Sequence, residues 1–184
     1  VRSRRQRQMC IRDRFFIAAP FGNYLKFKSL TNIIPVTGTW TLDYRSGYAG
    51  RALRIIMTMR YDRKRKGWKN KLGLPNEGIK KGLNKIKSNE ILSIAAIEDL
   101  DFKKLYELIP ENQSIEINLS CPNLDEESPL KWNDAYLFNK SINRKYCIAK
   151  ISPTTTLEQL TFLIEDLGFK QIHCCNTIPV KDGG

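Results

Sequence analysis

The sequence predicts an α/β protein with parallel strands, because strand-like and helix-like segments alternate along its 184 residues. Short apolar runs that end in turn residues predict the strands. Apolar residues at three- and four-residue spacing predict the helices between them. Parallel strands joined by right-handed crossovers all point the same way. Polar residues at their carboxyl ends are therefore expected on one side of the protein.

Composition is that of a globular chain long enough for one well-cored domain, with 41% hydrophobic residues. No run approaches the ~20 apolar residues of a membrane span, so we expect no membrane segment. The five cysteines lie at positions 10, 121, 147, 174 and 175. They show neither paired metal-ligand spacing nor a disulfide framework, so we expect a cytoplasmic protein with reduced thiols and no metal site.

The net charge of +12 is concentrated at the start of the chain, where residues 1–14 contribute +5 through six Arg and one Asp. This segment has no periodicity and is similar to translated sequencing-adapter sequence, so we treat it as a non-native basic leader. A genuine basic arm is the alternative. With this segment set aside, we expect no nucleic-acid partner.

The expected elements follow from apolar runs and their end signals. The expected strands cover residues 15–19, 33–36, 91–97, 115–119, 146–151 and 171–175. The expected helices cover residues 76–88 and 101–109, followed by one that ends at Leu167. A capping box of Thr155 and Glu158 should start this last helix, and Gly168 should stop it.

Three further segments carry weaker signals. Leu53, Ile56 and Met57 recur at helical spacing and are expected in the core. Residues 60–71 contain seven basic residues and one acid, with two aromatic residues interleaved, and are expected to form a solvated loop. A surface for phosphates and stacked bases is the alternative for that segment. Residues 124–133 are polar and are expected to form a loop.

The most informative stretch is Asn118-Leu119-Ser120-Cys121-Pro122-Asn123, which follows the apolar alternation of residues 115–117. Pro122 ends the strand, so Cys121 should lie where the strand opens into a loop. A thiol is a candidate acid or base, and the flanking amides can orient a polar heterocycle. The alternative is a small hydrophobic cysteine beside turn-forming residues.

Two later residues also stand out. Lys150 lies inside an apolar strand, which is costly unless the ammonium is paired, so a functional role is favoured. His173 is the single histidine and lies within the last strand. It is expected to be packed or held in one tautomer rather than to be catalytic.

The hexapeptide resembles the signature of the dihydroorotate dehydrogenases, flavin enzymes of pyrimidine biosynthesis built on a TIM barrel. Its Cys resembles the soluble class, since membrane-bound relatives carry Ser there. Residues 70–78 are similar to a second family element, which wraps the orotate ring. The resemblance also implies that the loop of residues 124–133 is mobile and could act as a lid of the site. The resemblance covers residues 15–184 and implies a TIM (β/α)8 barrel that is incomplete, with about six of its eight strands. The Gly183-Gly184 pair resembles the start of the family's phosphate-binding loop, so we expect a C-terminally truncated, inactive fragment that binds flavin weakly or not at all.

The resemblance also implies the site. FMN would be the cofactor, and Cys121 would take the C5 proton of dihydroorotate while the C6 hydride passes to the flavin, which yields orotate. The implied cofactor-binding residues are Ala18, Ala19, Thr39, Asn118 and Lys150. The implied substrate-binding residues are Lys26, Asn70, Leu72, Gly73, Leu74, Asn118, Asn123, Asn176 and Thr177. A homodimer is left open, and so is the electron acceptor (fumarate, NAD or quinone).

Two rival functions remain. The tRNA-dihydrouridine synthases are also FMN barrels with a Cys acid, but Ser120 stands where that family has Gly. A non-enzymatic RNA-binding module that uses the basic residues 60–71 is the other rival. Flavin in the purified protein would exclude this second rival.

Overall fold

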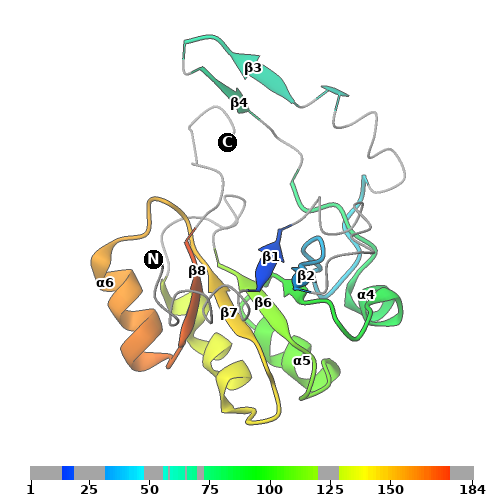
Figure 1. Cartoon of the computed structure of the whole chain (residues 1–184), viewed down its shortest axis with the longest axis vertical. Helices are drawn as coiled ribbons and strands as arrows, with labels where there is room; N and C mark the ends of the chain where they lie inside the picture. Colours follow the sequence, from blue (N-terminus) through cyan, green and yellow to red (C-terminus); the bar gives the residue numbers. More distant parts are fainter. Residues whose placement is uncertain are drawn as a thin grey trace, which may run out of the picture.

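The computed structural model of the chain describes residues 14–18, 32–47, 56–57, 59–64, 66–69, 73–119 and 129–174. Strands alternate with helices through most of this part of the chain (Figure 1). The strands are β1 (Phe15–Ile17), β2 (Ile33–Pro35), β3 (Arg60–Asp62), β4 (Gly67–Lys69), β5 (Leu92–Ile94), β6 (Ile115–Asn118), β7 (Cys147–Lys150) and β8 (Gln171–His173). The helices are α4 (Ile79–Lys85), α5 (Asp101–Leu108), the 3-10 helix η1 (Pro129–Lys140), α6 (Leu157–Thr161) and the π-helical turn η2 (Phe162–Asp166).

The main sheet has four parallel strands in the order β5-β6-β7-β8. β1 and β2 form a second parallel pair. The segment after β2 joins β5 through parallel bridges between Val36 and Ile91 and between Trp40 and Ile94. The α/β class with parallel strands is therefore confirmed.

The strands form a curled sheet, as shown by the contact between Phe16 of β1 and Tyr146, the residue before β7. Their rings meet edge to face with centroids 5.3 Å apart, although β2, β5 and β6 lie between these two strands in the order of pairing. Curling is the first step towards a barrel. The described residues contain no closed barrel, so the TIM (β/α)8 barrel remains a prediction.

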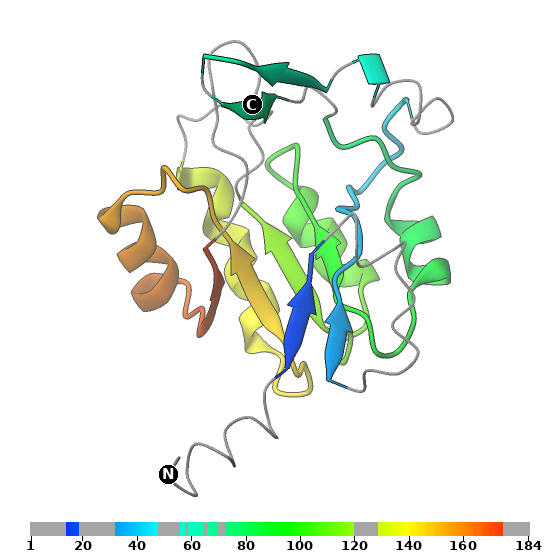
Figure 2. The same ribbon diagram turned by 45° about the horizontal axis from the view of Figure 1, so that its top comes forward.

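Helices cover the outer face of the main sheet and bury its apolar side chains (Figure 2). Ile115 and Ile117 of β6 and Ala149 of β7 are fully buried there. Phe102 of α5 and Phe138 of η1 pack over this face, with their rings edge to face at 6.3 Å. Burying each of these large side chains contributes about 1.5–3 kcal/mol relative to exposure, so this layer holds the strands in place.

The helix that follows β7 starts one residue later than the sequence predicts. Thr156 Oγ1 accepts the backbone N–H of Gln159 at 3.2 Å, and Gln159 Oε1 accepts that of Thr156 at 3.0 Å. The predicted box of Thr155 and Glu158 is wrong because the backbone N–H of Thr155 is already used in a turn with the carbonyl of Ser152. The predicted end is confirmed: Gly168 follows η2 with a positive φ of 73°.

α4 also begins later than predicted, at Ile79 rather than at Asn76. Asn76 Oδ1 accepts backbone N–H groups of Gly78 at 2.9 Å and Thr41 at 3.2 Å, so this side chain ties the turn before the helix to the chain after β2. Gly78 has φ of 83°, and a Cβ there would lie 3.2 Å from the backbone of Asp43 and Tyr44. Glycine is therefore required at this close approach.

Three other expectations are wrong. Ile56 and Met57 are 76% and 65% exposed rather than in the core; Leu53 lies outside the described residues. Residues 60–62 and 67–69 form the antiparallel strand pair of β3 and β4 instead of a loop. Figure 2 shows this hairpin at the end of the molecule towards which the parallel strands run.

The third correction concerns the expected loop of residues 124–133. Its last part, from Pro129 onward, belongs to η1, which packs Ala135 and Phe138 against the core. Residues 124–128 lie outside the described part of the chain. None of the helices in that part has the length and apolar character that crossing a bilayer requires.

Candidate functional site

The inner face of the curled sheet carries the candidate site, and strand register decides which side chains meet there. Side chains alternate between the two faces of each strand. Glu116 of β6 pairs with Ser93 of β5, and one row nearer the carboxyl ends Asn118 pairs with Lys150 of β7. Lys150 in turn pairs with His173 of β8. Two adjacent rows of polar side chains therefore line this face.

The inner face becomes apolar beside Glu116, where Ile148 lies in the same row, and in the positions below that row. Val36, Ile91 and Ile148 are buried together, and Ile34 and Tyr146 pack against them. Val36, Ile91 and Ile148 are 2%, 0% and 8% exposed, so little water contacts this floor. Electrostatic interactions above it are consequently stronger than they would be in bulk water.

Glu116 is the centre of the polar rows and is only 2% exposed. Its Oε2 lies 2.8 Å from His173 Nδ1. Its Oε1 accepts the hydroxyl of Ser93 at 3.1 Å and lies 3.9 Å from Lys150 Nζ. A buried carboxylate is stable only with such partners, and removing one partner of a buried ion pair typically costs about 3–5 kcal/mol.

A chain of hydrogen bonds connects Asn118 to the same carboxylate. Asn118 Nδ2 donates to Thr39 Oγ1 at 3.2 Å, and Thr39 Oγ1 lies 3.1 Å from Ser93 Oγ. Since Ser93 donates to Glu116, its oxygen accepts from Thr39. Each hydroxyl thus has one donor and one acceptor role, which fixes both rotamers.

Backbone hydrogen bonds hold Thr39 at this position. The N–H of Trp40 donates to the carbonyl of Ser93, and the N–H of Ala95 donates to the carbonyl of Trp40, both at 2.9 Å. These bonds attach the segment after β2 to β5. Main-chain pairing therefore positions the backbone of Thr39, and the hydrogen bonds to Asn118 and Ser93 orient its hydroxyl.

The structure brings together three of the residues that the sequence indicated: Thr39, Asn118 and Lys150. Ala18 directly follows β1 and is half-buried. Gly73 has a positive φ of 71°, and the carbonyl of Leu74 accepts Asn76 Nδ2 at 2.8 Å. Through Asn76 this segment is hydrogen-bonded to Thr41, and none of the hydrogen bonds of its described residues goes to Glu116.

The remaining expected site residues lie outside the described residues. They are Ala19, Lys26, Asn70, Leu72, Cys121, Asn123, Asn176 and Thr177. Cys121 is three positions after Asn118, the last residue of β6. Its role stays a prediction.

Sequence reasoning missed Glu116 and Ser93 as members of the site. The signal was present in Ile115-Glu116-Ile117, where a charged residue alternates with buried aliphatic ones. A charge at an inward position of a buried strand needs a partner, which is the argument that singled out Lys150. The expectation for His173 is confirmed in part, because its Nδ1 lies within hydrogen-bonding distance of Glu116.

Cys147, the first residue of β7, differs from a reactive cysteine. Burial raises the pKa of its thiol to about 12, and the nearby Arg144 only partly opposes this. The side chain packs with the outer core. At neutral pH Cys147 is therefore a thiol with no nucleophilic character.

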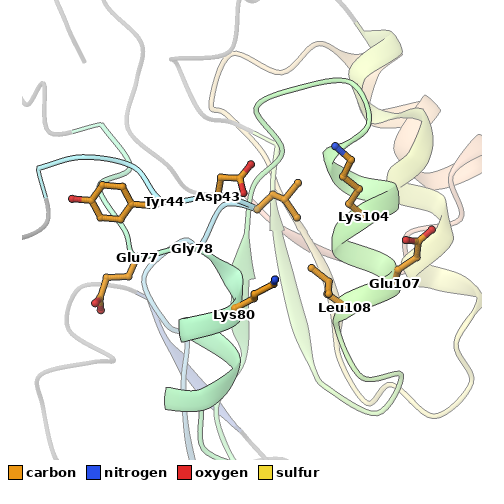
Figure 3. Close-up of a pocket in the computed structure, with 9 residues that line it drawn as sticks. Asp43, Tyr44, Glu77, Gly78, Lys80, Lys104, Glu107 and Leu108 are labelled. Atoms are coloured by element: carbon orange, nitrogen blue, oxygen red, sulfur yellow. The ribbon is translucent and has the colours of Figure 1, made fainter.

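A hollow of about 560 Å³ lies on the outer surface between α4 and α5, away from the inner face. Figure 3 shows Lys104 and Glu107 on one side of it and Asp43, Glu77 and Lys80 on the other. Glu77 is engaged by Lys81 and Lys85, whose hydrogen bonds lower the pKa of its carboxyl group. None of the residues that the sequence indicated lines this hollow, so the inner face remains the candidate site.

Fold and site together define an α/β protein whose polar site lies at the carboxyl ends of parallel strands, where such proteins bind their ligands. The chain is similar to the protein named "Dihydroorotate dehydrogenase B (NAD(+)), catalytic subunit" of Endomicrobium trichonymphae, with 29% identity over 160 residues. The match covers 78% of this chain and 49% of that relative, so the chain spans about half of the relative's length. No protein-family model matches the chain. The similarity supports a relationship to the dihydroorotate dehydrogenases.

Proposed function

We propose that this chain is part of an FMN-dependent enzyme that oxidises dihydroorotate to orotate in pyrimidine biosynthesis. The observation that carries the proposal is the convergence of Thr39, Asn118 and Lys150 around Glu116 at the carboxyl ends of parallel strands. These three are among the residues that the family resemblance implies for the cofactor. The similarity to a protein named for this activity supports the same reading. We also propose that the curled sheet is part of a (β/α)8 barrel.

The polar side chains of the inner face fit a flavin ring. Lys150 is 15% exposed, and its ammonium group lies 3.9 Å from Glu116 Oε1, beyond hydrogen-bonding length. Within the described residues its N–H donors have no hydrogen-bond acceptor, so they are available to a ligand oxygen. An ammonium, an amide and a hydroxyl match the carbonyl-bearing edge of such a ring. A bound FMN supplies the acceptor for two electrons.

The chain's own residues would bind and orient the reactants. Lys150 places a positive charge where negative charge builds during the reaction, a preorganised electrostatic role. Asn118, whose amide is fixed by Thr39, sets the orientation of a polar heterocycle. The apolar floor of Val36, Ile91 and Ile148 excludes water from below. We propose that Cys121, just beyond β6, removes the C5 proton of the substrate.

The test uses the protein expressed from its complete coding sequence. We expect it to purify with a flavin absorbance spectrum that dihydroorotate bleaches under anaerobic conditions. General-base catalysis typically contributes about 10²–10⁴-fold, so Cys121→Ala should slow this bleaching by about that factor. Cys174→Ala, at an exposed cysteine, is the matched control and should leave the rate unchanged.

Several results would contradict the proposal. A protein that carries no flavin would exclude the flavoenzyme class. Flavin that dihydroorotate does not bleach, together with retention on tRNA at physiological salt, would favour a tRNA-dihydrouridine synthase. A Cys121→Ala variant as fast as the wild type would show that another group takes the proton.

A further inference from the structure

Glu116 contacts both basic side chains of the inner face, although it lies one row below them. Its neighbours in its own row are Ser93 and Ile148. Lys150 and His173 lie in the next row towards the carboxyl ends. The carboxylate therefore reaches upward to the rim of the site, with its two oxygens turned to different partners.

The bond to Glu116 determines which nitrogen of His173 carries the proton. A carboxylate only accepts, so Nδ1, at 2.8 Å from Oε2, must be the N–H of the neutral ring. Nε2 lies on the opposite side of the imidazole and is left as an acceptor. The side chain is 29% exposed, and no residue in the described ranges hydrogen-bonds to Nε2.

The contact with Lys150 is of a different kind. At 3.9 Å the carboxylate neutralises the ammonium charge without accepting a hydrogen bond from it. The N–H groups of Lys150 therefore stay available above the carboxylate. Lys150 and His173 are register neighbours on adjacent strands, so their polar atoms belong to the same part of the rim.

We propose that Glu116 is a positioning residue of this site and that His173 Nε2 is a second polar contact, beside Lys150 Nζ, for one planar heterocyclic ligand. Glu116 holds the imidazole in the Nδ1–H tautomer and sets the net charge of the rim by balancing Lys150. The inference deepens the proposed function and rests on it for the identity of the ligand as a flavin. Ser93, Asn118 and Thr39 are the uncharged groups that complete the same hydrogen-bond chain.

The first measurement needs no flavin. Long-range ¹H–¹⁵N correlation of labelled histidine in the complete protein, at a pH where the ring is neutral, distinguishes the two tautomers. His173→Gln identifies the signal by its loss. We expect the Nδ1–H tautomer for His173, whereas the Nε2–H tautomer would overturn the proposal.

The second measurement is the midpoint potential of the bound flavin. Glu116→Gln removes a buried negative charge and leaves the rim one unit more positive. This change should favour the anionic reduced flavin over the oxidised form by on the order of tenfold in relative affinity and shift the potential to a more positive value. Glu165→Gln, at an exposed residue of η2, is the matched control and should leave the potential unchanged. If the midpoint potential of Glu116→Gln equals that of the wild type, the charge-balancing role is wrong. A purely structural role of Glu116 would not produce the expected shift to a more positive potential.

If Glu116→Gln does not fold, Glu116→Asp decides the matter. It retains the charge but shortens the side chain by one methylene, so the potential should stay near that of the wild type while His173 loses its preference for the Nδ1–H tautomer. An unchanged tautomer in this variant would contradict the positioning role. If the complete protein carries no flavin, the proposed function is wrong. The tautomer measurement would still decide whether Glu116 orients His173.

Discussion

Gly82 in α4 provides a sharp test of how the helix layer supports the site. Gly-to-Ala substitutions inside helices ordinarily stabilise a protein by about 0.5–1 kcal/mol, since glycine loses more backbone freedom on folding. Here the added Cβ would lie 2.7 Å from Cδ2 of Trp40 and 3.0 Å from two further ring atoms. Such distances are shorter than carbon atoms tolerate, so either the helix or the indole must move.

The backbone of Trp40 is held in place, because its N–H donates to Ser93 of β5 and its carbonyl accepts from Ala95 just after β5. Overpacking of this kind costs about 1–3 kcal/mol, which exceeds the gain in helix propensity. We therefore expect Gly82→Ala to lower the free energy of unfolding by about 1–2 kcal/mol. For a domain of this size the melting temperature should fall by about 2–8 °C. Thr39 precedes Trp40, so the affinity of the proposed site for flavin should fall as well.

The assay is thermal unfolding followed by circular dichroism, with Asn84→Ala as the matched control. Asn84 is exposed in the same helix, and its replacement should stabilise the protein slightly. A Gly82→Ala variant more stable than the wild type would refute the close packing of Trp40 on α4. If Gly82→Ala and Asn84→Ala destabilise the protein equally, the cause is a change in α4 itself rather than the contact between residue 82 and Trp40.

Two further predictions concern the ends of β7 and α6. Because burial raises the pKa of Cys147 from 9.0 to about 12, the folded state should lose stability as the pH rises from about 9 towards 12, where the unfolded thiol ionises first. Cys147→Ala should flatten this part of the pH–stability profile. Iodoacetamide should label Cys147 far more slowly than the exposed Cys174, and equal labelling rates would contradict the burial of the Cys147 thiol. Thr156→Ala should lower the free energy of unfolding by about 1 kcal/mol through loss of the capping box, whereas Thr155→Ala should change it little. The reverse order in chemical denaturation would place the helix start one residue earlier.

Much of the fold could be predicted because its signals are local. The segment before Asn118 and the one that contains Lys150 both form strands, since their aliphatic residues are buried against the helix layer. Pro110 and Gly168 marked helix ends where the backbone must leave the helical conformation. The predictions were wrong at the start of α6, where Thr155 with Glu158 and Thr156 with Gln159 both match a capping box. They were also wrong at Ile56 and Met57, whose helical spacing suggested burial although both side chains are exposed.

The candidate site was only half predictable. Lys150 could be singled out because an unpaired ammonium in a strand is costly, but its partner could not be named from the sequence. Glu116 satisfies the same criterion, but its position between two aliphatic residues also fits an ordinary strand alternation, so the pattern does not single it out. Ser93 carries no signal of its own, and its role arises from its place opposite Glu116 in the register.

The amino-acid sequence alone determined the order and type of the parallel strands and of the helices α4, α5 and α6, but not the β3–β4 hairpin or the start of η1. It could do so because hydrophobic periodicity and end signals act over a few neighbouring residues. The tertiary structure decided which polar groups meet. Glu116 and His173 are 57 positions apart, and Asn118 and Thr39 are 79 apart. Such contacts depend on strand register and on the curl of the sheet, which only the packing of the whole chain establishes.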